Sequence, residues 1–348
     1  MLPTLQVDAI QQVYNDGNHN AFTDMIRFGE RFYLTFRNCP DGHMLYETSR
    51  ILVLASDDGE TWESVHAFSV PKRDVRDPHF LVFQDRLFVL SGTWLVPDDP
   101  VKRHLNDHQG YAAWTDDGRV WHGPQLLLGT HGHYIWRASA CGDTAYLCGR
   151  RIRPDARGVA PEDVPGEDNE LVQSVMLASA DGFSWHEAAL FQPEYGNETA
   201  FLFEADGKVL AIGRGRGRER PAQVLRSAPP YKTWQRRFLD RELGGPLLAR
   251  WGGHYLVGGR DRPDGGEART ALFWLIDDRL VEATQLPSGG DTSYPGFVAL
   301  SPERALLSYY SSHEGSGSHL APSAIYLARL SLTEVSDVAS SQRDLAAR

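Results

Sequence analysis

Charged and aromatic residues recur at one point of a repeated pattern in this chain of 348 residues. Each copy has a polar lead, an apolar strand, a turn at Gly or Asp, a second apolar strand and a polar exit. Charged residues are almost never buried unpaired, so packing alone explains these leads poorly. If the leads meet in space, they offer carboxylates for proton transfer and a tyrosine for nucleophilic attack. They hold Asp24, Arg76 with Asp77, Trp136 with Arg137, Asn197 with Glu198, Gly245, and Ser293 with Tyr294.

Arginines dominate the exits of the second strands. These exits hold Arg37, Arg150, Arg214, Arg216, Arg260 and Arg262, with His313 and Glu314 in the last copy. Because guanidinium groups bind carboxylates through paired hydrogen bonds, a rim built from both sets suits a carboxylate-bearing sugar. We therefore predict a carbohydrate substrate held by Arg37, Arg76, Trp136, Arg137, Arg214, Arg260, His313 and Glu314.

The elements that would position these residues are six β-hairpins, which start near residues 22, 75, 134, 196, 243 and 292. Equivalent leads lie 48 to 61 residues apart, which is close to the repeat length of propeller blades with room for loops. We predict an all-β, six-bladed β-propeller formed by residues 1–348 as one domain. The ring closes if residues 323–332, near the end, pair with residues 5–14.

Four turn sequences lie between the hairpins: ASDDGETW from residue 55, WTDDGRVW from 114, ASADGFSW from 178 and SAPPYKTW from 227. In such turns an aspartate caps backbone amides, glycine supplies a positive φ and tryptophan packs between blades. We predict that Asp57 and Asp116 are the capping residues, with Ala180 in that place in the third turn. Their role is structural.

These turns resemble the Asp-box, or BNR repeat, of the sialidases, and the resemblance spans nearly the whole chain. NETAFLFEADGKVLAIGR is similar to the family's glutamate strand and its arginine, DTSYPGF to the nucleophile segment, SYYSSHEG to the Tyr-Glu motif, and RDPHFLVF to an Asp-Pro strand. The resemblance implies a glycosidase in which Glu198 activates the nucleophile Tyr294. It also implies roles for Asp77, Arg214 and Glu314, with Arg260 or Arg269 completing the arginines that hold a substrate carboxylate.

The chain departs from the sialidase pattern in the first repeat. Sialidases have an Arg-Ile-Pro motif there, which supplies one arginine of a triad, whereas this chain has Phe22-Thr23-Asp24. A carboxylate at that place would repel a sialic acid carboxylate, so we predict that Asp24 prevents efficient sialidase activity. The loop that holds the family's acid/base aspartate reads RNCPDGHM, which leaves Asp41 or His43 for that role.

Four functions remain open at this stage. The first is a retaining glycosidase that uses Tyr294 with Glu198, since tyrosine is a known exception to the two-carboxylate rule. The second is an inverting glycosidase that uses Asp24, Asp77 and Glu198. A polysaccharide lyase, with Tyr294 or a histidine as base, and a non-catalytic glycan-binding propeller are the others.

Composition and charge limit the classes of partner and the cellular compartment that we expect for this chain. A formal charge of −11 disfavours nucleic acid and anionic membranes. No apolar run approaches about 18 residues and no signal peptide is evident. Three cysteines without a CxxC motif favour a reducing compartment, so the cytoplasm is expected. We predict no cofactor and no metal, because His131 and His133 lack a third ligand. Residues 153–169 read as a mobile loop, residues after 332 as a frayed tail, and the oligomeric state stays open.

Overall fold

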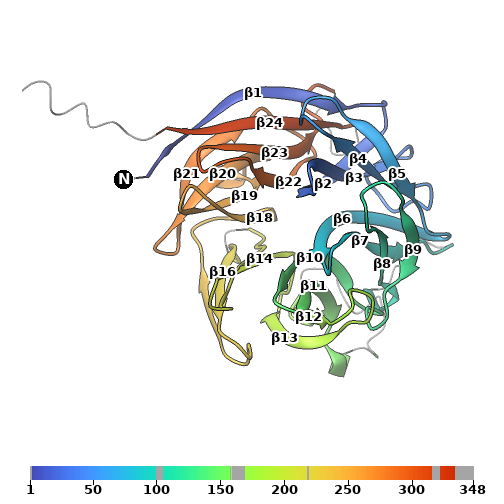
Figure 1. The fold of residues 1–348 in the computed structure, drawn as a ribbon. Coiled ribbons are helices and arrows are strands. Elements are labelled where there is room, and N and C mark those ends of the chain that lie inside the picture. Colours follow the sequence, from blue (N-terminus) through green and yellow to red (C-terminus); the bar gives the residue numbers. More distant parts are fainter. Residues whose placement is uncertain are drawn as a thin grey trace, which may run out of the picture.

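The computed structural model describes residues 2–98, 105–156, 158, 169–217, 219–315 and 322–333. These residues form six four-stranded antiparallel sheets that are arranged around a central axis (Figure 1). Three short 3-10 helices accompany them: η2 (Leu105–Asp107), η3 (Pro154–Ala156) and η5 (Pro263–Gly265). The prediction of an all-β, six-bladed propeller is confirmed. Of the predicted mobile loop, residues 157 and 159–168 lie outside the described residues, as does the predicted tail after residue 333.

The first three blades run outward from the axis in chain order. Blade 1 contains β2 (His19–Phe28), β3 (Arg31–Cys39), β4 (Arg50–Ser56) and β5 (Glu63–Phe68). Blade 2 contains β6 (Arg73–Phe83), β7 (Arg86–Leu95), β8 (Gln109–Thr115) and β9 (His122–Leu126). Blade 3 contains β10 (Tyr134–Cys141), β11 (Thr144–Ile152), β12 (Val172–Ser179) and β13 (His186–Gln192).

The next two blades repeat this order, and the last one uses both ends of the chain. Blade 4 contains β14 (Thr199–Phe203), β15 (Val209–Gly213), β16 (Gln223–Ser227) and β17 (Trp234–Phe238). Blade 5 contains β18 (Gly244–Trp251), β19 (His254–Asp261), β20 (Arg269–Ile276) and β21 (Arg279–Leu286). Blade 6 contains β22 (Thr292–Ala299), β23 (Arg304–Ser311), β24 (Ala324–Thr333) and β1 (Thr4–Tyr14).

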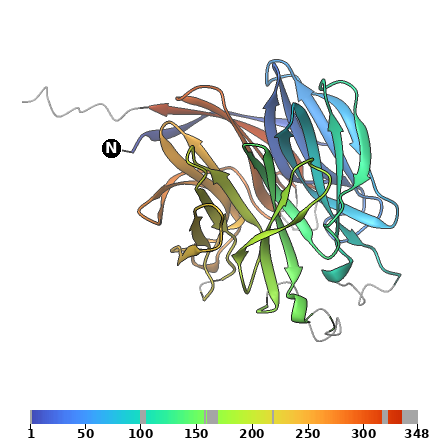
Figure 2. The same cartoon turned by 60° about the horizontal axis from the view of Figure 1, so that its bottom comes forward.

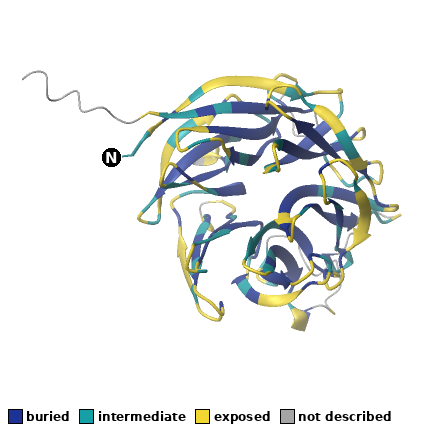
Figure 3. Cartoon of the chain, viewed as in Figure 1, coloured by how far each residue is buried: buried dark blue, intermediate teal, exposed yellow. Residues whose placement is uncertain are grey.

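The pairing of β1 with β24 closes the ring. It runs from Thr4 opposite Thr333 to Tyr14 opposite Ile325, so the first strand of the chain completes the last blade. The outermost strands are the most exposed, whereas the inner strands are largely buried where the blades pack against one another (Figure 3). Turned by 60°, the molecule shows loops at both ends of the strands of each blade (Figure 2). The expected closure is confirmed.

Most inner strands carry a β-bulge close to their first residues. The register shifts between Ala21 and Asp24 in β2, and between Arg76 and His79 in β6. Equivalent shifts occur in β10, β18 and β22. A bulge adds residues that the partner strand does not match and redirects the side chains there. The residues that start the bulges are Phe22, Asp77, Trp136, Gly245 and Tyr294, so Phe22 and not Asp24 is the counterpart of Asp77 in blade 1.

The turns that join the third and fourth strands of blades 1, 2 and 3 are capped one residue later than predicted. Asp58 Oδ1 accepts hydrogen bonds from the amides of Glu60 and Thr61, and Asp117 and Asp181 make the same pair of bonds. The assignment of this role to Asp57 and Asp116 was wrong, because those side chains pair with Arg31 and Arg86. The third turn is capped by Asp181 even though it has Ala180.

Cys39, Cys141 and Cys148 are all free thiols. Among the described residues, no helix has the length and apolar character needed to cross a membrane.

Candidate active site

A cavity of about 470 Å³ lies where the leads of the inner strands converge. All six blades contribute to it, because each inner strand begins at this end of the ring. Its walls combine six arginines with three carboxylates and several aromatic rings. The lining residues are Phe22, His43, Met44, Leu45, Arg76, Asp77, Trp94, Tyr134, Arg150, Glu198, Arg214, Arg216, Arg260, Arg262, Asp291 and Tyr294.

Tyr294 and Glu198 form the closest pair of reactive groups in this cavity. The Tyr294 hydroxyl donates a hydrogen bond of 2.7 Å to Oε1 of Glu198. Arg214 Nη1 donates to the same carboxylate oxygen at 2.8 Å and lies 3.0 Å from the tyrosine oxygen. The backbone amide of Gly245 donates to Oε2 of Glu198 at 3.0 Å. Tyr294 occupies the bulge of β22 with a φ of +50°, which turns its ring toward Glu198.

The surroundings separate the protonation states of these two side chains. Burial opposes the ionisation of Glu198, but the charge of Arg214 and the hydrogen bond from Tyr294 outweigh it, so the pKa of Glu198 is lowered. Burial and the negative charge of Glu198 raise the pKa of Tyr294 above its ordinary value. Glu198 is therefore a carboxylate and Tyr294 a neutral phenol at neutral pH, which are the states required of a base and of the nucleophile it activates.

Asp77 is the second carboxyl group in this part of the cavity. Burial, followed by the charge of Glu198, raises the pKa of Asp77 to about 7. The hydroxyl of Tyr134 donates a short hydrogen bond to Oδ2 of Asp77. A carboxyl group that keeps its proton near neutral pH can donate a hydrogen bond or a proton to a bound ligand.

We expect Asp77→Asn to change how stability depends on pH. Above about pH 4 the unfolded carboxyl group ionises while the folded one keeps its proton, so the folded wild type loses stability as pH rises toward 7. Asparagine has no such titration and tolerates the φ of +49° at this position. Between pH 4 and pH 8, the free energy of unfolding of the variant should rise relative to that of the wild type by on the order of a few kcal/mol. Denaturant unfolding at several pH values measures this, and parallel stability curves would contradict it.

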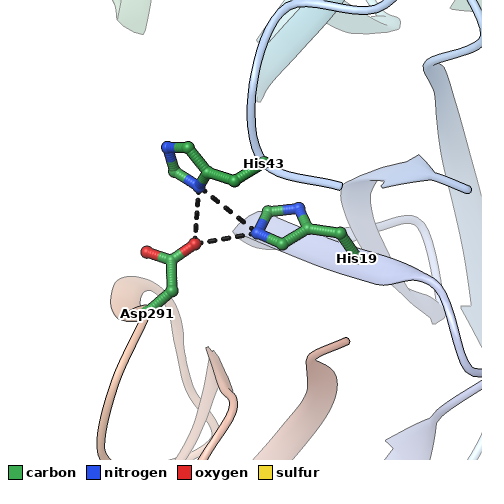
Figure 4. Close-up of side chains that lie close together, drawn as sticks. All are labelled: His19, His43 and Asp291. Carbon is green, nitrogen blue, oxygen red and sulfur yellow. Dashed lines mark hydrogen bonds and ion pairs between the residues drawn. The ribbon is translucent and has the colours of Figure 1, made fainter. Parts of the chain in front are cut away.

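Three further side chains meet at the rim between the first and last blades (Figure 4). Nε2 of His19 lies 2.8 Å from Oδ2 of Asp291, and Nδ1 of His43 lies 2.6 Å from the same oxygen. The hydroxyl of Tyr310 donates to the other oxygen of Asp291 at 2.8 Å. Burial opposes the ionisation of Asp291, but the hydrogen bonds from the two histidines outweigh it and hold the pKa of Asp291 well below its usual range.

Comparison with known proteins rests on structure, since no family model and no curated protein sequence matches the chain. A protein of unknown function from Dyadobacter fermentans is 18% identical, with a TM-score of 0.74 over 95% of this chain and all of that one. Trypanosoma rangeli sialidase in complex with sialic acid is 14% identical, with a TM-score of 0.64 over 90% of this chain and 55% of that one. A Hadza microbial sialidase has a TM-score of 0.65 at 14% identity and is covered over 65% of its length.

The chain has the sialidase fold. Identities this low show the fold alone, because the same propeller can carry unrelated sites. The chain spans a little over half of the trypanosomal enzyme and about two thirds of the Hadza enzyme. Any activity therefore has to be argued from the cavity itself.

Seven of the predicted site residues line the cavity of this sialidase fold. Six of them flank the start of an inner strand or the end of its partner strand, as the repeats predicted, and His43 lies in the loop that the sialidase resemblance indicated. The seven are His43, Arg76, Asp77, Glu198, Arg214, Arg260 and Tyr294. Asp41, the alternative to His43, is exposed and accepts a hydrogen bond from Thr48 outside the cavity.

Asp24 and Arg137 lie below the cavity, in the central channel, and do not line it. Oδ1 of Asp24 is 3.2 Å from Nη1 of Arg137, and Oδ2 accepts the backbone amide of Phe80 at 2.9 Å. Arg137 also donates to the carbonyls of Pro246 and Pro295. The bulge in β2 moves Asp24 two positions past the rim, so we withdraw its proposed roles in catalysis and in repelling a substrate carboxylate.

The other predicted residues outside the cavity have structural partners. Arg37 forms a fully buried ion pair with Asp74, and Trp136 packs beneath Tyr294 with ring centroids 6.3 Å apart. His313 contacts Ser311, and Glu314 accepts a hydrogen bond from Tyr326. Arg269, the alternative to Arg260, pairs with Asp261 and Glu282. A long side chain at a strand end can turn either way, so its residue type alone did not decide its place.

Sequence reasoning missed His19, Asp291 and Tyr134. Asp291 stands three residues before Tyr294 in the segment identified as the nucleophile region, so its position was a usable signal. His19 and Tyr134 begin β2 and β10, five residues before Asp24 and two residues before Trp136. Their contacts join residues far apart in the chain, which periodicity cannot reveal.

Proposed function

We propose that this chain is a retaining glycosidase for a carboxylate-bearing glycoside, with Tyr294 as nucleophile and Glu198 as its base. The observation that carries the proposal is the 2.7 Å hydrogen bond from a neutral phenol to an ionised, buried carboxylate. As the phenol oxygen attacks the anomeric carbon, its proton passes to Glu198 and the bond to the leaving group breaks. Water then releases the sugar from the tyrosine, and the proton returns from Glu198.

Arg214 supports the same step electrostatically. Its Nη1 contacts both the carboxylate and the phenol oxygen, so it stabilises negative charge that develops on the tyrosine during attack. A neutral nucleophile also suits a substrate whose carboxylate is close to the anomeric carbon, because an anionic nucleophile would be repelled by it.

The charge of the cavity favours an acidic sugar. Six arginines line it against three carboxyl groups, and the pKa of Asp77 is raised to about 7, so that group carries less than a full negative charge at neutral pH. Arg260 lies over the ring of Tyr294, with its guanidinium carbon 5.6 Å from the ring centroid. A carboxylate bound there would sit beside the nucleophile.

Arg260→Met should weaken the use of an acidic substrate selectively. We expect kcat/KM for a carboxylate-bearing aryl glycoside to fall about 10- to 100-fold, since hydrogen bonds to charged groups contribute about 1.5–3 kcal/mol. The methyl ester of the same glycoside, which has no charge to pair, should lose much less. Equal losses on the acid and its ester would show that Arg260 does not bind the carboxylate.

The proposed function is tested by screening aryl sialosides, aryl uronides and neutral aryl glycosides for release of the phenol. We expect turnover of an acidic member, with NMR showing that the first sugar product keeps the anomeric configuration of the substrate. Inversion would favour a two-carboxylate mechanism with Asp77 and Glu198. An unsaturated uronate product would identify a lyase, and binding without turnover would identify a glycan-binding protein.

A further inference from the structure

The cluster of His19, His43 and Asp291 (Figure 4) has no role in the chemistry described above, yet His43 and Asp291 line the cavity. His19 and Asp291 are almost fully buried, with exposed side-chain fractions of 1% and 2%, whereas His43 is 25% exposed. His43 lies on the loop between β3 and β4, and Asp291 directly precedes β22. The cluster therefore brings the blade that holds the nucleophile into contact with a loop of the first blade.

The partners of the two histidines determine which ring nitrogens carry protons. Arg37 Nη1, which can only donate, lies 3.3 Å from Nδ1 of His19, so this nitrogen is an acceptor and Nε2 carries the proton. Burial lowers the pKa of His19 to about 4, which keeps the ring neutral. His43 Nδ1 faces the Asp291 carboxylate at 2.6 Å and donates to it. In neutral His43 this leaves the lone pair on Nε2, on the side of the ring that points away from Asp291 and His19 in Figure 4.

The same proton positions argue against a metal site, although these three residues are a common ligand set. A cation bound by Nε2 of His19 would force the proton onto Nδ1, where it would face the Arg37 guanidinium. Histidine ligands normally direct that proton to a carboxylate or a carbonyl, and arginine offers no acceptor. Arg260, 3.5 Å from Asp291, adds a second positive charge beside the cluster.

Buried arginines hold the backbone on both sides of His43. Arg37 donates to the carbonyls of Gly42 and Met44, at 3.0 and 2.9 Å. Arg76 donates to the carbonyl of His43, and both arginines pair with the buried Asp74. The position of the imidazole is therefore set by its own backbone and by Asp291 together. Asp291 and His19 face the imidazole directly, and Arg76 binds the backbone carbonyl of His43. Arg260 and Tyr310 contact Asp291, and Arg37 contacts His19, so these groups act on the imidazole through the cluster.

Phe22 relates His43 to the nucleophile. The Phe22 ring lies 5.0 Å from the ring of Tyr294 and 5.7 Å from the ring of His43, measured between centroids. The nucleophile and the imidazole thus both contact one aromatic ring in the wall of the same cavity, so a sugar over Phe22 would lie next to both. We propose that His43, oriented by Asp291, transfers the proton to and from the glycosidic oxygen.

This assignment rests on the proposed function, and each proton transferred in its two steps has a donor and an acceptor. His43 in its doubly protonated form gives the Nε2 proton to the glycosidic oxygen as that oxygen leaves the anomeric carbon. In the same step the Tyr294 oxygen forms a bond to the anomeric carbon and its proton passes to Glu198. Neutral His43 then takes a proton from water as the water oxygen replaces Tyr294 at that carbon. Histidine suits both steps because one imidazole nitrogen can donate a proton in the first step and accept one in the second. His19, held neutral by burial, acts as a positioning residue.

The decisive experiment compares two leaving groups on one sugar. With His43→Gln, we expect turnover of an alkyl glycoside to fall about 10²- to 10⁴-fold, as is typical when general acid catalysis is lost. The 2,4-dinitrophenyl glycoside should lose far less in its first step, because that leaving group needs no proton. Azide is a nucleophile that needs no base, so it should restore the overall turnover of the 2,4-dinitrophenyl glycoside by the variant and yield a glycosyl azide. His186→Gln, at an exposed position on β13, is the matched control. Equal losses on both glycosides, without azide rescue, would overturn the proposal.

A second measurement does not depend on activity. Two-bond proton–nitrogen NMR spectra of protein labelled with ¹⁵N-histidine, assigned with His19→Gln and His43→Gln, report each tautomer. We expect neutral His43 to carry its proton on Nδ1 and His19 on Nε2, with neither signal shifted by added zinc. A proton on Nε2 of neutral His43, or zinc bound by the cluster, would refute the assignment. If Tyr294→Phe stays active while the leaving-group result holds, the nucleophile is wrong and the role of His43 stands.

Discussion

Replacing Tyr294 with phenylalanine should reduce turnover of an acidic aryl glycoside by more than about 10⁴-fold, because it deletes the one oxygen that can attack. The ring keeps its packing against Phe22 and Trp136, so the fold should survive. The lost hydrogen bond to Glu198 should cost only about 1 kcal/mol of folding free energy. Initial rates, together with a thermal melt, measure both effects.

Glu198→Gln provides the companion variant for Tyr294→Phe. It preserves size while removing the proton acceptor, so we expect a loss of about 10²- to 10⁴-fold. The double variant should be scarcely slower than Tyr294→Phe alone, since residues that act in one step are not additive. Near-normal activity of Tyr294→Phe would disprove the nucleophile and favour a mechanism based on the carboxyl groups of Asp77 and Glu198.

The largest expected effect on stability belongs to Arg137. Its guanidinium is buried in the central channel and joins Asp24 in blade 1 to the carbonyls of Pro246 and Pro295 in blades 5 and 6. Arg137→Met removes the positive charge that pairs with the buried Asp24 carboxylate, which keeps only the Phe80 amide and His79 as partners. Breaking a buried ion pair in this way costs about 3–5 kcal/mol. Because Pro295 follows Tyr294 in the chain, the variant should also disturb the bulge that positions the nucleophile.

Guanidinium unfolding of Arg137→Met tests this prediction. Arg237→Met is the matched control, since Arg237 is largely exposed and its ion pair with Asp278 should contribute less than about 1 kcal/mol. Adding Asp24→Asn to Arg137→Met should recover part of the loss, because it removes the unpaired charge. If Arg137→Met unfolds at the same denaturant concentration as the wild type, the contacts of Arg137 with Asp24, Pro246 and Pro295 do not stabilise the fold.

The fold was largely predictable because its information is local and repeated. Each hairpin shows its own alternation and turn residues, and six copies at a blade-length spacing leave few alternative architectures. The closing pair of strands could be recognised because no other partner was left for the first strand. Glu198, Arg214 and Tyr294 could be located for the same reason, since each adjoins the rim end of a strand.

The sequence by itself therefore determined the six blades, their closure and the residues beside Tyr294. Only the tertiary structure decided that the bulge of β2 places Phe22 at the rim and Asp24 in the channel. A bulge changes the direction of side chains without altering the pattern of residue types, so the sequence does not reveal it. The tertiary structure also decided that His19, His43 and Asp291 meet, and that Arg37 and Arg137 point inward. These contacts join residues up to 272 positions apart, and they depend on loop paths and on long side chains, neither of which a repeat specifies.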